Sequence, residues 1–425
     1  MLERTRNPPD SPGRQATADA YRQVRDASVA LIAGLAPEDA ALQSMPDASP
    51  SKWHLAHTTW FFEQFVLGRD PGYNPYDARW NYLFNSYYQS VGPMHARPQR
   101  GLLSRPTLAE VLDYRAQIDA RMEALLADAE DDAEDDAQTR SLVTLGLHHE
   151  QQHQELLLTD IKHLFSLNPL EPAFRPAKPR DTCAVVPLRY LQGAQGIAEI
   201  GHAGAAFAFD CETPRHRVLL QPHALANRPV NNGEFRDFVR DGGYRQPALW
   251  MSEGWNTVQQ RQWAHPLYWS DDLESEFTLG GRVSLDAAAP VCHISFFEAD
   301  AYARWAGARL PTEAEWESAV ATQEVQGHFA DDGALHPLPP QVGPGILQAY
   351  GDVWEWTASP YVNYPGYRPL AGALGEYNGK FMCGQYVLRG GSCVTPPGHV
   401  RATYRNFFTP ADRWQFTGLR LGQDR

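Results

Sequence analysis

The sequence has few cysteines, no long apolar run and no excess of positive charge, and each shortage excludes a class of protein. Five cysteines are scattered along 425 residues without a Cys-x-x-Cys pair, which argues against a disulfide scaffold and a zinc ribbon. No run of about 18 apolar residues that could span a membrane is present, and the first residues lack the apolar segment of a secretory signal. We therefore expect a cytoplasmic protein with reduced thiols.

The charge and composition narrow the class further. The net charge of −14 at pH 7 disfavours nucleic acid and anionic membranes as partners. Hydrophobic residues make up 43% of the chain, with 12 Trp and 18 Tyr, which is typical of a globular protein. A chain of 425 residues exceeds the usual size of one core, so two domains are expected. These numbers do not indicate an oligomeric state.

The first 167 residues read as a bundle of helices. Apolar residues recur at helical spacing, and Thr107 with Glu110 three residues later matches a capping box. The predicted helices cover residues 18–34, 51–67, 107–126 and 140–167. Four such segments favour an up-down four-helix bundle over residues 1–167.

The amino-acid composition and the expected secondary structure change after residue 167. Residues 168–184 contain a proline-rich stretch, NPLEPAFRPAKPRD, that reads as a linker. Residues 185–425 are rich in Gly, Pro and Trp and show short β-type runs, with helical patterns only at 290–306 and 312–320. This part is expected to be an irregular α+β domain with an aromatic core.

The strongest chemical pattern is LHHEQQHQELL, in which His149 and His153 lie four residues apart on a predicted helix. That spacing places both imidazoles on one face, where they can share a metal ion. A third ligand is expected from KWHLAHTTWFFE, which carries His54 and His57 three residues apart. The spacing alone leaves the choice between these two open.

Three functional classes remain possible for such a site. Residues 149–153 match the HExxH pattern of zinc hydrolases, with Glu150 as general base. The third ligand of those enzymes is missing, because Thr159 stands where the extended pattern needs histidine, and Glu171 lies in the proline-rich linker. A three-histidine site with open positions better suits iron(II) that handles O2. A non-catalytic binding module is the third alternative.

Longer motifs resemble a known family. SMPDASPSKWHLAHTTWFFE, YLFNSYYQSVG, RGLLSRPT and LGLHHEQQHQELLLTDIKH resemble the first half of the ergothioneine-synthesising sulfoxide synthases. RLPTEAEWE, GDVWEWTASPY, NGKFMCGQYVLRGGSC and RWQFTGLRL resemble the formylglycine-generating-enzyme (sulfatase-modifying factor) domain that is fused in the same enzymes. The resemblance covers about residues 18 to 422. It implies a multidomain α and α+β protein, with a DinB-like four-helix domain followed by a C-type-lectin-like domain.

The resemblance also implies roles for residues of the first half. It makes His57, His149 and His153 the ligands of iron(II), Fe(2+), and it makes Gln152 a contact of trimethylhistidine (hercynine). In the branch with NSYY, a tyrosine acts beside the oxygen, which implies Tyr87 or Tyr88 as proton donor.

Residues for the organic substrates are predicted from their chemistry. A trimethylammonium group cannot donate a hydrogen bond and is best held by aromatic faces, which indicates Trp414 and Phe416. The carboxylate of the thiol substrate needs cationic partners, and Arg97 and Arg100 follow the SYY motif. RGGSC holds Cys393 without a later cysteine, so the copper–thiol chemistry of formylglycine-generating enzymes is not expected.

The predicted reaction is an iron(II)- and O2-dependent joining of a thiol to the imidazole C2 of hercynine, which yields a sulfoxide. Cysteine or γ-glutamylcysteine is the expected thiol. The alternative is a selenoneine synthase, which takes a selenosugar and forms a C–Se bond on the same hercynine. Both reactions use the same metal site, and sequence spacing does not distinguish their donors.

Overall fold

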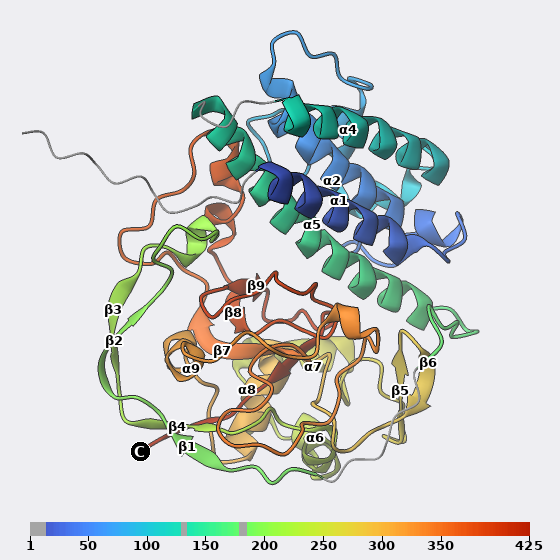
Figure 1. The fold of residues 1–425 in the computed structure, drawn as a ribbon. Helices are drawn as coiled ribbons and strands as arrows, with labels where there is room; N and C mark the ends of the chain where they lie inside the picture. The colour runs from blue at the N-terminus through green and yellow to red at the C-terminus, as the bar shows by residue number, and fades with distance from the viewer. Residues whose placement is uncertain (1–13, 129–133, 178–184) are drawn as a thin grey trace, which may run out of the picture. The chain divides into compact units, whose positions relative to one another are not determined.

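The computed structural model describes residues 14–128, 134–177 and 185–425, and it divides into two compact units (Figure 1). The first, here called the helical unit, contains the described residues up to Leu157 together with Ala203–Phe209 and Leu370–Tyr377. The second, here called the sheet unit, contains the remaining described residues. Within the described residues, no helix combines the length and the apolar character that crossing a bilayer requires.

The helical unit contains the predicted bundle. Its long helices among the described residues lie side by side in Figure 1, and a short helix α3 precedes α4. Their bounds are α1 Arg14–Ile32, α2 Ser51–Phe65, α3 Trp80–Phe84, α4 Leu108–Asp128 and α5 Glu134–Ser166, of which the part from Leu158 on belongs to the sheet unit. The prediction of a four-helix amino-terminal domain is therefore confirmed, with helix ends shifted by a few residues.

Local chemistry explains where two of these helices begin. Thr107 Oγ1 accepts a hydrogen bond from the Glu110 backbone N–H at 3.2 Å, and Glu110 Oε2 accepts from the Thr107 N–H at 2.7 Å. This reciprocal pair is the capping box expected from the sequence. Helix α2 starts at Ser51 directly after Pro50, which lacks the N–H that a first turn leaves unused.

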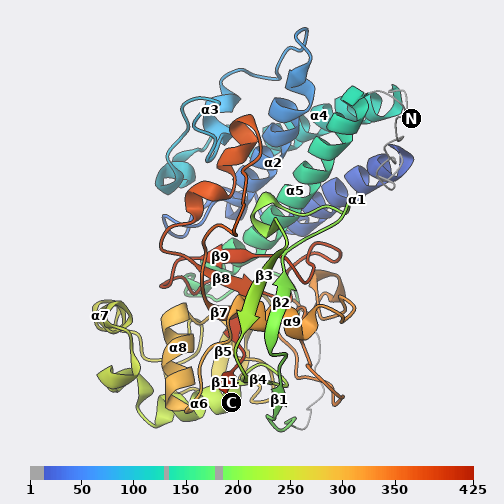
Figure 2. The ribbon, with the colours of Figure 1, turned by 90° about the vertical axis from the view of Figure 1, so that its left-hand side faces the viewer.

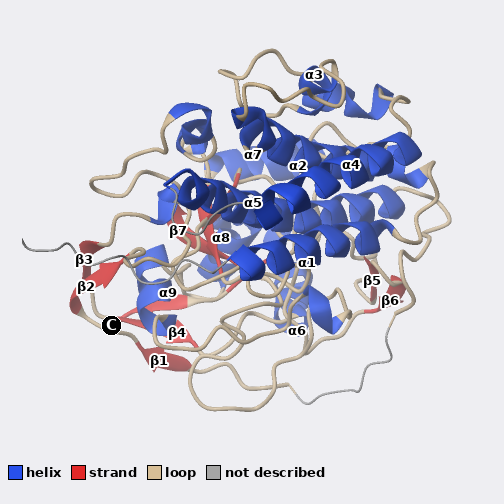
Figure 3. Cartoon of the chain, turned by 45° about the horizontal axis from the view of Figure 1, so that its top comes forward, coloured by secondary structure: helices blue, strands red, loops and turns tan. Residues whose placement is uncertain are grey.

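The sheet unit contains all the strands of the described residues, drawn red in Figure 3. One four-stranded sheet has the order β10-β7-β8-β9, with β10 parallel to β7 and the other pairs antiparallel. A three-stranded sheet has the order β1-β4-β11, and β2–β3 and β5–β6 form two-stranded sheets. The bounds are β1 Tyr190–Gln192, β2 Gly196–Ile200, β3 His216–Leu220, β4 His223–Ala226, β5 Ser275–Thr278, β6 Gly281–Ser284, β7 Trp354–Pro360, β8 Tyr386–Arg389, β9 Asn406–Phe408, β10 Thr417–Leu419 and β11 Gly422–Asp424.

Two helices cover opposite faces of the four-stranded sheet (Figure 2). Trp356 and Glu355 are neighbours on β7, so their side chains point to opposite faces. Trp356 packs against Phe296 at the start of α8, and Glu355 accepts a hydrogen bond from Trp316 of α9. The helices of this unit are α6 Asn232–Arg240, α7 Ser252–Arg261, α8 Phe296–Trp305 and α9 Glu313–Val320. The sequence predicted α8 and α9 but not α6 and α7.

The predicted linker begins just after α5, which ends at Ser166, but residues 178–184 lie outside the described part of the chain. The proposed limits of 1–167, 168–184 and 185–425 therefore stay predictions. The four described cysteines, Cys211, Cys292, Cys383 and Cys393, are free thiols. This agrees with the expectation that the chain is not built on disulfides.

Candidate metal centre

Three imidazoles meet in the core of the helical unit. Helix α2 supplies His57, and helix α5 supplies His149 and His153, which lie one turn apart on the same face. Each offers a ring nitrogen, and these nitrogens all lie within 4.8 Å of one another. All three side chains are buried, with at most 6% of their surface exposed. Buried imidazoles that converge in this way are typical of a metal site.

The hydrogen bonds of His57 fix its tautomer. Its Nδ1 lies 2.6 Å from the backbone oxygen of Phe84, which can only accept. Nδ1 therefore carries the proton, and Nε2 keeps the lone pair that a metal needs. His57 Nε2 faces His149 Nε2 at 3.2 Å. The last residue of α3 thus orients the imidazole of α2 toward α5.

His54 has a different position from His57. Its Nδ1 lies 2.8 Å from Nδ1 of His153, the nitrogen on the far side of the ring from Nε2. This contact leaves Nε2 of His153 available for the cluster and resembles the outer contacts that orient metal-binding histidines. The structure therefore brings His57, not His54, together with His149 and His153.

The spacing of the ring nitrogens fits a transition metal. Two nitrogens each about 2.1 Å from one ion, at an angle between 90° and 109°, are about 3.0–3.4 Å apart. The observed 3.2 Å between His57 Nε2 and His149 Nε2 lies within this range. Nδ1 of His149 is buried without a hydrogen-bond partner among the described residues. The donor set of three imidazoles suits iron(II) as well as zinc.

Burial keeps the three imidazoles neutral. It lowers the pKa of His149 to about 3. Burial, reinforced by the neighbouring imidazoles, also holds the pKa values of His57 and His153 well below the ordinary value. Neutral imidazoles present lone pairs at physiological pH, so a metal does not have to displace protons from them.

Glu150, the acid of the HExxH pattern, is not available as a base for a metal-bound water. Its side chain is 1% exposed and accepts hydrogen bonds from Arg25 Nη1 and Ser28 Oγ of α1 and from Arg115 Nη2 of α4. Burial by itself raises the pKa of Glu150, but the guanidiniums of Arg115 and Arg25 outweigh it and hold the pKa at about 2. The zinc-hydrolase alternative therefore lacks its general base.

An aromatic stack supports His57 from one side. The indole of Trp53 lies parallel to the His57 ring, with centroids 4.7 Å apart. The guanidinium carbon of Arg100 lies 3.3 Å from the centre of the Trp53 ring, and Arg100 donates hydrogen bonds to Ser49 and Ser86. Arg100 is buried in this position, so its direct contact with a substrate carboxylate stays a prediction.

A tyrosine from the segment Leu370–Tyr377 reaches the same cluster. The ring of Tyr377 lies 5.6 Å from that of His149, edge to face, and its hydroxyl donates a hydrogen bond to Oε1 of Gln152. Phe209, from the other inserted segment, stacks on Tyr377. Sequence reasoning found Gln152 but missed Tyr377, although EYNGKF stands beside a motif that carried the resemblance.

Comparisons with known proteins agree with these two units. Residues 20–157 match the DinB superfamily, and residues 191–342 and 339–425 match the sulfatase-modifying factor enzyme 1-like domain. The hercynine oxygenase of Mycobacterium tuberculosis is 33% identical, over 91% of this chain and 94% of that protein. The chain belongs to the ergothioneine sulfoxide synthase family. The hercynine oxygenase of Mycolicibacterium smegmatis is 32% identical over 97% of this chain and 99% of that protein. Ergothioneine biosynthesis protein 1 of Schizosaccharomyces pombe is 28% identical over 51% of this chain and 27% of that protein.

The tyrosine pair predicted for this synthase family occupies two environments. Tyr88 is fully buried, its ring packs against Phe65 and Trp60, and its hydroxyl has no hydrogen-bond partner among the described residues. Burial raises the pKa of Tyr88 far above its ordinary value, so it remains a neutral phenol. Tyr87 is half-buried with a left-handed backbone, φ 72°. Their role as proton donors stays a prediction.

The remaining predicted substrate residues are also placed. Phe416 is buried in the sheet unit, where its ring contacts His293 and lies 4.8 Å from Nζ of Lys162. Trp414 packs near Phe408. In the helical unit, Arg97 donates a hydrogen bond to the backbone oxygen of Asp47. Substrate binding by Trp414, Phe416 and Arg97 stays a prediction.

Proposed function

We propose that this protein joins a thiol to the imidazole C2 of hercynine, using iron(II) and O2. Hercynine and the thiol lose one hydrogen each, one oxygen atom enters the sulfoxide, and the other leaves as water. The observation that carries the proposal is the convergence of His57, His149 and His153 from two helices in a chain related to hercynine oxygenases over nearly its whole length. We also propose a cytoplasmic location, supported by the free thiols.

His57, His149 and His153 would hold the iron(II). When bound, such an ion supplies the activation of O2 and lowers the pKa of a thiol that binds it. The protein contributes neutral imidazoles in a dry core, held by Phe84, His54 and the stack of Trp53. The ion pairs of Glu150 with Arg25 and Arg115 fix α5 against α1 and α4, which keeps the imidazoles in place.

The proton needed during carbon–sulfur coupling would come from a phenol. Tyr377 is the new candidate, because it contacts both His149 and Gln152. Tyr88 and Tyr87 remain candidates from the sequence. A phenol beside the reacting oxygen donates a proton and thereby favours coupling over oxidation of the thiol alone, which would give a sulfinic acid.

The organic substrates would bind through residues of matching chemistry. Gln152 would help to hold hercynine, and the aromatic rings of Trp414 and Phe416 would hold its trimethylammonium group. Arg97 and Arg100 would pair with the carboxylate of the thiol. The donor would be cysteine or γ-glutamylcysteine, and a selenosugar in the selenoneine alternative.

The test is an anaerobic reconstitution with iron(II) and hercynine, followed by O2 with cysteine, γ-glutamylcysteine or a selenosugar in separate reactions. Mass spectrometry of the products identifies the donor. A hercynine sulfoxide from either thiol supports the proposal. A product from the selenosugar alone replaces it with the selenoneine synthase, and the absence of any hercynine adduct in all three reactions contradicts both.

A further inference from the structure

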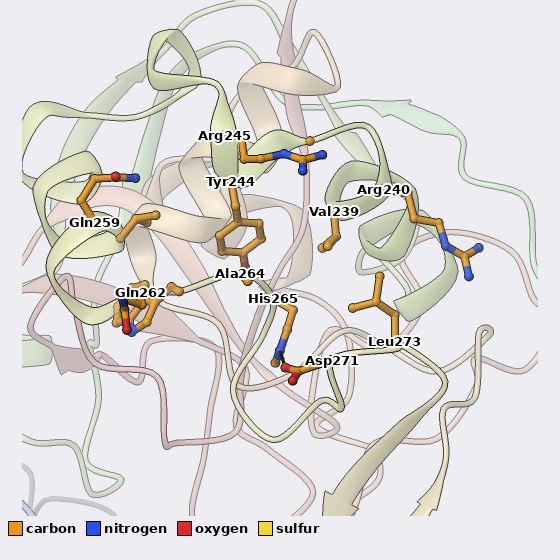
Figure 4. A pocket seen from close by; sticks show the side chains of 13 residues that line it. Val239, Arg240, Tyr244, Arg245, Gln259, Gln262, Ala264, His265, Asp271 and Leu273 are labelled. Carbon is orange, nitrogen blue, oxygen red and sulfur yellow. Dashed lines mark hydrogen bonds and ion pairs between the residues drawn. The ribbon is translucent and has the colours of Figure 1, made fainter.

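A cavity of about 600 Å³ opens in the sheet unit, lined by residues of the sequence range 239–273 (Figure 4). It lies at the end of α6, the 3-10 helix η5 (Gly243–Arg245), the end of α7 and the chain that follows. The proposed reaction uses none of these residues. A volume of this size is typical of pockets for small organic ligands, which occupy about 300–1,000 Å³.

The floor of this cavity is held in place by buried hydrogen bonds. Tyr244 is 5% exposed, and its hydroxyl donates to Glu298 Oε1 at 2.5 Å. Trp263 is 9% exposed, with the guanidinium carbon of Arg413 3.9 Å from its ring centre. Arg413 also donates to Glu298 Oε1 at 3.0 Å. The two aromatic rings are therefore fixed, and a ligand would meet a preformed surface.

Two arginines line the cavity, and Figure 4 shows Arg245 above Tyr244 and Arg240 farther to the right, beyond Val239. Arg240 and Arg245 flank the turn Gly242–Gly243, in which Gly242 has φ 80°. A side chain on Gly243 would collide with the buried ring of Phe238 at 2.1 Å, so the turn is tight. The Arg245 N–H donates to the Gly242 oxygen at 2.8 Å. The two glycines therefore permit the tight turn that separates Arg240 from Arg245.

The charged groups at the cavity favour an anion. Arg240 shares the carboxylate of Glu274 with Arg236, and Asp271 is paired with His265 (dashed in Figure 4). Arg245 is exposed, and its guanidinium makes no hydrogen bond or ion pair with any residue that the structure describes. Although the whole chain has a net charge of −14, the unpaired guanidinium of Arg245 gives the cavity a local positive charge.

Further polar groups stand at the same cavity. The amides of Gln259 and Gln262 line the cavity, and neither side chain has a hydrogen bond within the described part of the chain. Gln262 and Leu273 also line it, and both have left-handed backbones, with φ 53° and 64°. Gln262 is the C-cap of α7, where a left-handed residue commonly ends a helix, so its conformation positions the side chain and carries no argument for a ligand.

We propose that this cavity binds a small organic anion, whose carboxylate or phosphate pairs with Arg245 while its body rests on Tyr244 and Trp263, with Arg240 as a second positive charge of the lining. Guanidinium groups form paired hydrogen bonds with both kinds of oxyanion. The rings of the floor provide an apolar surface for the rest of the ligand, and the two glutamine amides offer hydrogen bonds to its polar groups.

The test is calorimetric titration of the full chain with three probes: citrate, inorganic phosphate and adenosine monophosphate. Saturable binding of citrate indicates a carboxylate ligand, and tighter binding of adenosine monophosphate than of inorganic phosphate indicates a phosphate on an organic body. In either case, Arg245→Ala is expected to weaken binding by about ten- to a hundredfold, as for the loss of a charged hydrogen-bond pair. Arg240→Ala is expected to weaken it less, because Glu274 already engages that side chain.

Two control variants make the outcome decisive. Arg217→Ala removes an exposed arginine of β3 in the same unit and is expected to leave the affinity unchanged. His57→Ala is expected to leave it unchanged as well, whatever becomes of the metal centre. The proposal is overturned if no probe binds at millimolar concentration, if Arg245→Ala binds like the wild type, or if His57→Ala abolishes binding.

Discussion

The hydroxyl of Tyr377 donates a hydrogen bond to the side-chain oxygen of Gln152, and the Tyr377 ring lies edge to face against His149. Gln152 and His149 are three residues apart on α5, so both lie on one side of that helix. Tyr377 comes from a segment more than 200 residues later in the chain. A phenol is thereby held beside the histidine cluster.

Tyr377→Phe removes this phenol without removing its ring. We expect the ratio of hercynine sulfoxide to sulfinic acid to fall at least about tenfold, because a positioned proton donor is commonly worth 10²–10⁴ in rate. Mass spectrometry of both products measures the ratio, with Tyr82→Phe, an exposed tyrosine of α3, as the control. Tyr87→Phe and Tyr88→Phe are compared in the same assay. An unchanged ratio in all three variants contradicts a tyrosine proton donor.

Replacement of Glu150 by Gln tests its role as an anchor of the helix. In the folded protein the pKa of the Glu150 carboxyl is about 2, against an ordinary value of 4.5. The Glu150 carboxylate therefore stabilises the fold fully above about pH 4.5, and this stabilisation is lost as the pH falls toward 2. The lowered pKa of Glu150 corresponds to about 3 kcal/mol of unfolding free energy between pH 4.5 and pH 2. Urea denaturation from pH 6 to 3 should show a shallower fall for Glu150→Gln than for the wild type.

The same variant should also be less stable at pH 7, by about 3–5 kcal/mol, because two buried guanidiniums lose their partner. Glu123→Gln, in an exposed ion pair with Arg22, should behave like the wild type. A Glu150→Gln protein of unchanged stability that loses only its turnover would instead indicate a general base, as in the hydrolase alternative.

His54→Ala tests the outer contact of His153. If His54 only orients His153, its loss should lower the affinity for iron(II) by about 10–100-fold without changing the stoichiometry. Anaerobic equilibrium dialysis measures both quantities. His148→Ala is the control. His148 is next to His149 in the chain, but its ring stacks on that of Phe207, with centroids 4.1 Å apart, and is not part of the cluster. Wild-type affinity in His54→Ala would show that the contact has no influence on the metal.

Gly146→Ala tests the close approach of α2 and α5. An added methyl would lie 2.6 Å from a ring carbon of Phe62 and 2.9 Å from one of Phe61, and both rings are buried. Overpacking of this kind costs about 1–3 kcal/mol. Phe61 also contacts the His149 ring, so the affinity for iron(II) should fall although every ligand is retained.

Gly34→Ala is the matched control, because nothing lies within 4 Å of the added methyl. Denaturation and metal titration of both variants provide the comparison. If Gly146→Ala is more stable than the wild type, as alanine in an exposed helix would be, the helices have room to adjust and the argument from tight packing is wrong.

The helices and the histidine pair could be predicted from the sequence because both depend on local spacing. The period of apolar residues located the bundle, and four-residue spacing placed His149 and His153 on one face. The choice between His54 and His57 depends on the backbone oxygen of Phe84, the last residue of α3, which is 27 residues away from His57 in the chain. Spacing within α2 contains no information on that contact.

The sequence analysis also missed Tyr377 and the helices α6 and α7. Tyr377 joins the cluster through an insertion in the second half of the chain. Helices α6 and α7 were missed although α8 and α9, which are no longer, were predicted, so length does not account for the difference. The capping box of Asn231 and Glu234 at α6 was present in the sequence as a signal that could have located it.

The central claim is that one iron(II) ion binds to His57, His149 and His153. Anaerobic titration with iron(II), followed by metal analysis after gel filtration, tests it most directly. The account predicts one iron per wild-type chain and a loss of binding of at least about a hundredfold in His57→Ala, His149→Ala and His153→Ala alike. Retention of one iron per chain with wild-type affinity in any of these three variants would contradict it.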